Sequence, residues 1–152
     1  MKNTTLGYIE KDGKYLMMHR IKKVNDINRD KWIGIGGKVE PGETPHECMV
    51  REAYEETGLQ IKNIKYRGLV TFISNECEQE FMHLFTTADF TGSLNENCNE
   101  GVLEWIDKDK IFDLPSWEGD KIFLELLKTE EKFFSLKLVY EGNTLVESKL
   151  DI

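Results

Sequence analysis

Cysteine and long apolar runs are scarce in this sequence of 152 residues, and each scarcity excludes a class of protein. The three cysteines, Cys48, Cys77 and Cys98, include no CxxC pair, so neither a disulfide framework nor a zinc knuckle is expected. No apolar run approaches the roughly 18 residues that a membrane-spanning helix needs. The residues after Met1 also lack the apolar core of a secretory signal. We therefore expect a cytoplasmic protein that is neither secreted nor held in a membrane.

Positive charge is in deficit. The 20 lysines and arginines stand against 28 aspartates and glutamates, which gives a formal net charge of -8. Such a chain repels a nucleic-acid polymer, and no dense basic stripe offsets the repulsion, whereas a small phosphate ligand can still bind through metal ions. The hydrophobic fraction of 39% and the charged fraction of 32% are ordinary for a soluble protein. We expect residues 1–152 to form one domain, since this length suits a single core.

Strands are predicted where β-branched and aromatic residues gather between turn signals. The turn sequence Lys11-Asp12-Gly13 has apolar residues on both sides, so Thr5 to Arg20 is expected to form a hairpin. Further strands are expected at Ile61 to Ile73, Glu80 to Phe90 and Val102 to Ile106, and a second hairpin at Phe133 to Tyr140 and Thr144 to Leu150. The polar stretch from Lys22 to Lys31 is expected to be a surface loop.

Two helices are predicted from end signals and spacing. Thr44 and Glu47 have the spacing of a capping box, Pro45 suits the first helical position, and Gly58 suits a left-handed end. Apolar residues recur at helical spacing from Trp117 to Lys128, which predicts a second helix. Because strands and helices do not alternate regularly, we predict an α/β (α+β) fold, with helices on the faces of a mixed sheet.

Three glutamates share one face of the first predicted helix. Glu52, Glu55 and Glu56 stand at positions i, i+3 and i+4, where like charges destabilise an isolated helix by roughly 0.2 to 0.5 kcal/mol per pair. A divalent cation reverses the sign of that interaction. Carboxylate oxygens suit Mg2+ or Mn2+, which commonly bridge to the phosphates of a substrate. This face therefore predicts a metal site that binds a diphosphate.

The glutamates lie within a longer pattern. Gly37 is followed after five residues by Glu43, and after seven more by Arg51 to Leu59, with Gly58 near the end. This pattern is the Nudix box, and the chain resembles the Nudix hydrolase family. The resemblance implies an α/β/α sandwich with a mixed sheet and a requirement for Mg2+, or Mn2+. It implies metal-binding or catalytic roles for Glu52, Glu55, Glu56 and Glu100, a ligand role for the Gly36 carbonyl, and structural roles for Gly37, Glu43, Arg51 and Gly58.

Other segments resemble the MutT/MutX-type members, which sanitise oxidised purine nucleotides. They are Trp32 with the glycines after it, Asn99 to Trp105, and Trp117 to Asp120. This resemblance implies hydrolysis of a nucleoside triphosphate such as 8-oxo-dGTP to the monophosphate and pyrophosphate. It also implies that Lys38 faces phosphate and that Trp117 and Asp120 hold the purine.

Two departures and several alternatives stand beside this prediction. The animal enzymes have an Asn where this chain has Ile33, and two adjacent Asp residues where it has Gly119 and Asp120. Trp117 could equally be a core residue, because aromatic side chains dominate cores. The alternative functions are hydrolysis of an ADP-sugar or dinucleoside polyphosphate and nucleotide sensing without turnover. The sequence leaves open the catalytic base among the carboxylates, the phosphorus attacked, the number of metals and the oligomeric state.

Overall fold

The structure, a computed structural model, describes residues 1–96 and 98–152. In chain order its elements are β1 (Lys2–Lys11), β2 (Lys14–His19), β3 (Trp32–Ile33), α1 (Pro45–Thr57), β4 (Gln60–Lys62), β5 (Lys65–Ser74), β6 (Glu80–Thr87), β7 (Asp89–Thr91), β8 (Val102–Asp107), the 3-10 turn η1 (Ile111–Asp113), α2 (Glu118–Thr129), β9 (Phe134–Glu141) and β10 (Thr144–Asp151). None of the helices in these ranges is long and apolar enough to cross a membrane.

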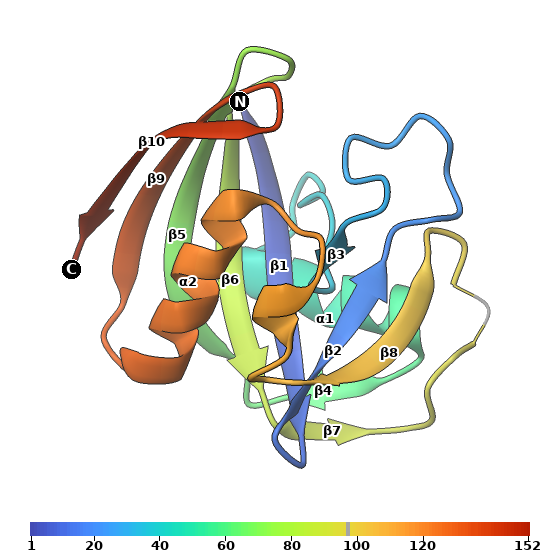
Figure 1. The fold of residues 1–152 in the computed structure, drawn as a ribbon. Coiled ribbons are helices and arrows are strands. Elements are labelled where there is room, and N and C mark those ends of the chain that lie inside the picture. The colour runs from blue at the N-terminus through green and yellow to red at the C-terminus, as the bar shows by residue number, and fades with distance from the viewer. Residues whose placement is uncertain (97) are drawn as a thin grey trace.

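The large sheet is mixed, as predicted. Its strand order is β10-β9-β5-β6-β1-β2-β3, and β8 also pairs with β2. The pairs β1–β6 and β5–β9 are parallel, whereas β1–β2, β5–β6 and β9–β10 are antiparallel. Figure 1 shows α2 in front of this sheet and α1 behind it. Strands β4 and β7 form a separate two-stranded sheet. The predicted α/β/α sandwich is thus confirmed.

Each helix covers one apolar cluster, and the sheet separates the two clusters. Phe123, Leu124 and Leu127 of α2 pack with sheet residues such as Phe134 and Leu136. The cluster under α1 contains, from the helix, Met49 and Ala53, together with Ile9, Leu16, Met18, Ile35 and Phe85. Alternate residues of a strand point to opposite faces, so one sheet supplies side chains to both clusters.

Helix α1 begins and ends where its sequence predicts. The Thr44 side chain accepts a hydrogen bond from the Glu47 N–H, and the Glu47 carboxylate accepts one from the Thr44 N–H, which completes the capping box. Pro45 opens the helix, and Gly58 ends it in the left-handed region at φ 79°. A Cβ on Gly58 would also lie 2.9 Å from the Ser93 carbonyl oxygen. Local signals therefore fix both ends of the helix that carries the three glutamates.

Two predicted strands are each broken in the structure. The segment from Ile61 to Ile73 divides into β4 and β5 at Asn63, which has a positive φ of 50°. The segment from Glu80 to Phe90 divides into β6 and β7 around Ala88. The short pieces pair with each other, Ile61 opposite Phe90, and so leave the large sheet. The predictions of single long strands were wrong because this local pairing competes with the large sheet.

Replacement of Gly58 by alanine should destabilise the fold more than the same change at Gly42. Both glycines have positive φ, 79° and 82°, which costs an L-residue about 1 to 2 kcal/mol. Only Gly58 also has a backbone oxygen in the way, because a Cβ on Gly42 meets nothing within 4 Å. Urea denaturation should show a loss of about 1 to 2 kcal/mol for Gly42→Ala and a larger loss for Gly58→Ala. Equal losses would show that the Ser93 contact has no energetic weight.

Candidate active site

The glycine-rich segment between β3 and α1 lies along β1. The Gly7 N–H donates to the Ile35 carbonyl at 2.6 Å, and the Thr5 N–H donates to the Gly37 carbonyl at 2.8 Å. Because backbone groups alternate in direction along an extended segment, the Gly36 carbonyl between them points away from β1. A Cβ on Gly36 would lie 1.9 Å from the Thr5 carbonyl oxygen, so only glycine fits there.

Gly37 brings this segment against helix α1. A Cβ on Gly37 would lie 2.4 Å from Cδ of Glu52, so the Glu52 carboxylate occupies the space that a side chain would need. The two halves of the motif therefore meet at one point. The loop backbone and the helical carboxylate are in direct contact there because residue 37 has no side chain.

Arg51 ties the acidic residues of the motif together. Its Nε and Nη2 donate to the Glu43 carboxylate at 2.7 and 3.0 Å, and its Nη1 donates to Glu52 at 2.9 Å and to Glu55 at 3.2 Å. Nη2 also donates to the Lys38 carbonyl at 3.1 Å. These hydrogen bonds lower the pKa of Glu43 to about 2 and raise the pKa of Arg51 above its usual range. Arg51 therefore stays charged and fixes the loop to the helix.

Glu56 is the most buried of the three glutamates, with 8% of its surface exposed. Burial, the nearby charge of Glu100 and a hydrogen bond with Glu52 together raise the pKa of Glu56 to about 10. At neutral pH Glu56 therefore retains its proton in the metal-free protein. Glu55 is different, because 57% of its side chain is exposed and its contact is with Arg51.

The carboxylates suit a divalent cation, although they do not form a ready cage. Within residues 1–96 and 98–152, no three His, Cys, Asp or Glu side chains converge closely enough to hold a metal ion. The charges of Glu52 and Glu100 nevertheless act on Glu56. Glu56 retains its proton because burial and these negative charges disfavour its ionised form. An ion would replace that proton and draw the side chains together. These residues, with the Gly36 carbonyl, fit a hard oxygen-preferring ion.

Glu100 lies beside a basic segment, Arg20 to Lys23, which leads into the predicted surface loop. Its carboxylate is 3.4 Å from Nη1 of Arg20 and 3.4 Å from Nζ of Lys23. Lys22 donates to the Cys98 carbonyl at 2.6 Å, which ties the same segment to the loop before Glu100. In the sequence, the basic run Arg20-Ile21-Lys22-Lys23 directly after β2 could have indicated a segment that contacts acidic residues. Lys38, in contrast, is exposed and is held through its backbone.

Trp117 and Asp120 lie on the other face of the sheet, at the start of α2. Trp117 is 6% exposed, and its ring meets those of Phe72 and Tyr140 edge-on at 5.5 and 5.0 Å. It is thus part of the α2 core. Its indole N–H donates to Asn28 at 2.7 Å, and Nζ of Lys31 lies 4.4 Å from the centre of its ring. The loop before β3 therefore covers Trp117 with polar side chains.

Several buried polar groups near Trp117 lack partners. The hydroxyls of Tyr8 and Ser116 have no hydrogen-bond partner in the described chain. Burial raises the pKa of Tyr8, and the nearby Gly34 backbone partly opposes that shift. Asp120 is 6% exposed, and burial raises its pKa to about 8 while Lys31 partly opposes the shift. Unpaired buried polar groups are rare and costly in proteins, so Tyr8 and Ser116 are available to bind a ligand or water.

The structure explains both departures from the animal enzymes. Ile33 packs into the cluster under α1, whereas its neighbour Trp32 packs into the cluster under α2. Ile33 therefore contributes to the apolar core. A Cβ on Gly119 would lie 2.5 Å from Cδ1 of Leu138 and 2.7 Å from the Tyr140 hydroxyl, so a larger residue there would require these side chains to shift. Glycine at this position allows the close packing of α2 on β9.

Replacing Glu56 by glutamine should stabilise the metal-free protein at alkaline pH. The pKa of Glu56 is raised from 4.5 to about 10, so its contribution to stability is complete below pH 4.5 and is lost as pH rises towards 10. Glutamine does not ionise, so this loss should disappear in Glu56→Gln. Urea denaturation in EDTA at pH 6 and pH 9 measures the effect, with the exposed Glu55→Gln as control. A wild-type stability that fell no more than that of Glu56→Gln would contradict the assignment.

Comparison with known proteins agrees with this geometry. The model of the NUDIX domain matches residues 4–127. The chain is 30% identical over 131 residues to an uncharacterised Nudix hydrolase, YvcI, of Bacillus subtilis, covering 84% of this chain and 79% of that protein. It is also 30% identical over 151 residues to the oxidized purine nucleoside triphosphate hydrolase of Danio rerio, covering 99% of this chain and 94% of that protein.

A solved structure is similar over nearly the whole length. The crystal structure of a MutT protein from Bacillus halodurans superimposes with a TM-score of 0.89 at 26% identity, covering 99% of this chain and 98% of that one. Fold, motif and sequence similarity thus agree over most of the chain. The chain belongs to the Nudix hydrolase family and is an enzyme that acts on nucleotide derivatives.

Proposed function

We propose that this enzyme hydrolyses a nucleoside triphosphate to the monophosphate and pyrophosphate, using Mg2+ or Mn2+, and that its substrate is an oxidised purine nucleotide such as 8-oxo-dGTP. One observation carries the proposal. A single loop, residues 20–31, contacts both Glu100 of the acidic cluster, through Arg20 and Lys23, and the Trp117 side chain, through Asn28 and Lys31. A nucleotide has the matching layout, with phosphates at one end and a base at the other.

At the phosphate end, the enzyme's own residues position the reacting groups. Bound Mg2+ would neutralise phosphate oxygens and stabilise the leaving pyrophosphate. Glu52, Glu56, Glu100 and the Gly36 carbonyl would hold the ion, and one of Glu52, Glu55, Glu56 and Glu100 would accept a proton from the attacking water. Arg51 keeps Glu52 and Glu55 in place through hydrogen bonds of 2.9 and 3.2 Å. Exposed Lys38 and the cations of the loop would attract the phosphate charge.

At the base end, a purine would stack on Trp117 by replacing Lys31, whose Nζ now lies 4.4 Å from the centre of the ring. Stacking of a base on an aromatic side chain contributes about 1 to 3 kcal/mol and does not distinguish one purine from another. Selectivity therefore depends on polar groups. With a pKa of about 8, Asp120 is mostly protonated at neutral pH, so its carboxyl group both donates and accepts. Tyr8 and Ser116 add two further unpaired hydroxyls.

The similarity to a named oxidized purine nucleoside triphosphate hydrolase supports this substrate class over nearly the full chain. The alternatives are hydrolysis of an ADP-sugar or a dinucleoside polyphosphate, and a nucleotide sensor without turnover. Loss of motif glutamates would favour the sensor. Glu52, Glu55 and Glu56 are all present, and the first two contact Arg51. The geometry therefore favours turnover.

A nucleotide panel with Mg2+ should show release of pyrophosphate, fastest from 8-oxo-dGTP. The panel includes dGTP, ADP-ribose and a dinucleoside polyphosphate, with products separated by chromatography. Glu56→Gln should lower kcat by orders of magnitude while the fold is retained, because the site loses a charge that holds the metal. Near-normal turnover of Glu56→Gln at saturating Mg2+ would remove Glu56 from the site, and binding without any turnover would identify a sensor.

Asp120→Ala should reduce discrimination between purines, whereas Trp117→Ala should weaken all purines alike. Loss of the partner of a buried polar group costs about 1 to 3 kcal/mol, enough to change the preference roughly 5- to 150-fold. The measurement is kcat/KM for 8-oxo-dGTP and dGTP in each variant. Trp105→Ala is the control, since Trp105 stacks on Phe90 in the α1 cluster. An unchanged ratio in folded Asp120→Ala would exclude Asp120 from base recognition.

A further inference from the structure

Strand β10 forms one end of the large sheet, with β9 as its neighbour in the strand order (Figure 1). Its outer edge is therefore open in the described chain. A long open edge presents unpaired backbone N–H and C=O groups, which favour pairing with another strand. Two apolar residues on β10 are also exposed, Val146 by 50% and Leu150 by 41%. This edge lies outside the candidate active site.

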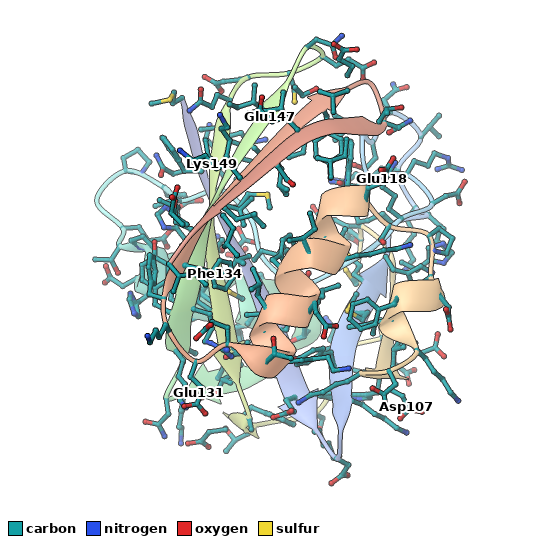
Figure 2. The ribbon with its side chains drawn as sticks, turned by 60° about the vertical axis from the view of Figure 1, so that its left-hand side comes forward. Asp107, Glu118, Glu131, Phe134, Glu147 and Lys149 are labelled. Carbon is teal, nitrogen blue, oxygen red and sulfur yellow. The ribbon has the colours of Figure 1, made fainter. Side chains whose placement is uncertain are left out.

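The side chains of β10 alternate in a regular way after a bulge. The register on β9 passes from Leu145 opposite Tyr140 to Glu147 opposite Val139, so Val146 is the extra residue. Beyond it, Ser148 and Leu150 lie on the face that α2 covers, because they stand opposite the buried Leu138 and Leu136. Glu147 and Lys149 lie on the other face. Figure 2 shows both along the same strand.

This pattern is complementary to itself. In an antiparallel pair of β10 strands centred on Ser148, each Glu147 stands opposite Lys149 of the second copy, and each Val146 stands opposite Leu150. Opposite charges and apolar pairs directly across two strands stabilise the pairing. We propose that two copies of this chain form a symmetric dimer by antiparallel pairing of β10 in this register, which would continue the sheet from one copy into the other.

The charges disfavour the neighbouring registers. Alternative registers of this antiparallel pair differ by steps of two residues, because only then do the backbone N–H and C=O groups on the outer edges of the two strands face each other. Centring on Glu147 places two glutamates together, and centring on Lys149 places two lysines together and Glu147 opposite Asp151. Centring on Leu150 pairs Lys149 with Asp151 but leaves Val146 without a partner. The register centred on Ser148 pairs both the charges and the apolar residues.

The contacts within one chain point the same way. Lys137 on β9 is 2.8 Å from the Glu147 carboxylate, and it also stands directly opposite Lys149. Two lysines opposite each other destabilise a strand pair. Among the described residues Lys149 has no ion-pair partner. The second copy would supply one, its Glu147.

The dimer should be weak and dependent on concentration. Stable interfaces commonly bury about 1,600 Å2 in total, and a short ladder of strand residues buries less. Sedimentation velocity from low to high micromolar concentration should therefore show a reversible shift of the wild-type protein from monomer to dimer. A wild-type protein that stays monomeric throughout this range would overturn the proposal.

Charge exchange tests the register. Lys149→Glu should be monomeric at all these concentrations, because Glu147 and residue 149 would then both be acidic. The double variant Lys137→Glu with Glu147→Lys preserves the ion pair within the chain and should also be monomeric. An equimolar mixture of the two should dimerise again, since every carboxylate then faces a lysine. Failure of the mixture to associate, or dimerisation of either variant alone, would contradict this register.

Lys62→Glu is the matched control. It makes the same change of charge at an exposed position on β4, in the separate small sheet, and should dimerise like the wild type. If Lys62→Glu also became monomeric, net charge rather than the β10 pairing would explain the loss, and the proposal would fail. Circular dichroism melting of every variant verifies that a change in mass is not a change in folding.

Discussion

The guanidinium group of Arg51 connects all parts of the Nudix motif. It reaches the Lys38 carbonyl in the glycine-rich segment, the Glu43 carboxylate in the following loop, and Glu52 and Glu55 on its own helix. Because a guanidinium presents its donors in a rigid planar fork, it holds several acceptors at defined distances at once. The position of the acidic helix face relative to the glycine backbone therefore depends on this one side chain.

The acidic cluster of this site lowers the stability of the folded protein in the absence of a cation. Burial and mutual repulsion leave Glu56 protonated, and on the other face of the sheet Asp120 is affected in the same direction by burial alone. Tyr8 and Ser116 add buried hydroxyls without partners. Groups of this kind destabilise the free protein and become favourable only when a ligand supplies the missing charge or hydrogen bonds.

Features set by neighbouring residues could be predicted from the sequence, and features set by distant contacts could not. The ends of α1 follow from Thr44, Pro45 and Gly58, each acting within one helical turn. The division of the predicted strand at Asn63 depends on the pairing of β4 with β7, which lies far along the chain. Trp117 is covered by a loop whose Asn28 accepts a hydrogen bond from the indole N–H, and the two residues are 89 positions apart. No local sequence pattern predicts that contact. For the same reason no sequence pattern brings Tyr8, Ser116 and Lys31 near Trp117, whereas the shared face of Glu52, Glu55 and Glu56 follows from their spacing in one helix.

Lys31 contacts two parts of the molecule at once. Its Nζ lies over Trp117 and also donates to Asn143, in the turn between β9 and β10, at 3.3 Å. Under the proposed function, a base stacked on Trp117 would displace Lys31 from that ring and so change its hydrogen bond to the turn. Binding of the base and the position of the β9–β10 turn would then be thermodynamically linked, and such linkage is reciprocal. Through Lys31, the hairpin at the edge of the sheet would respond to the substrate.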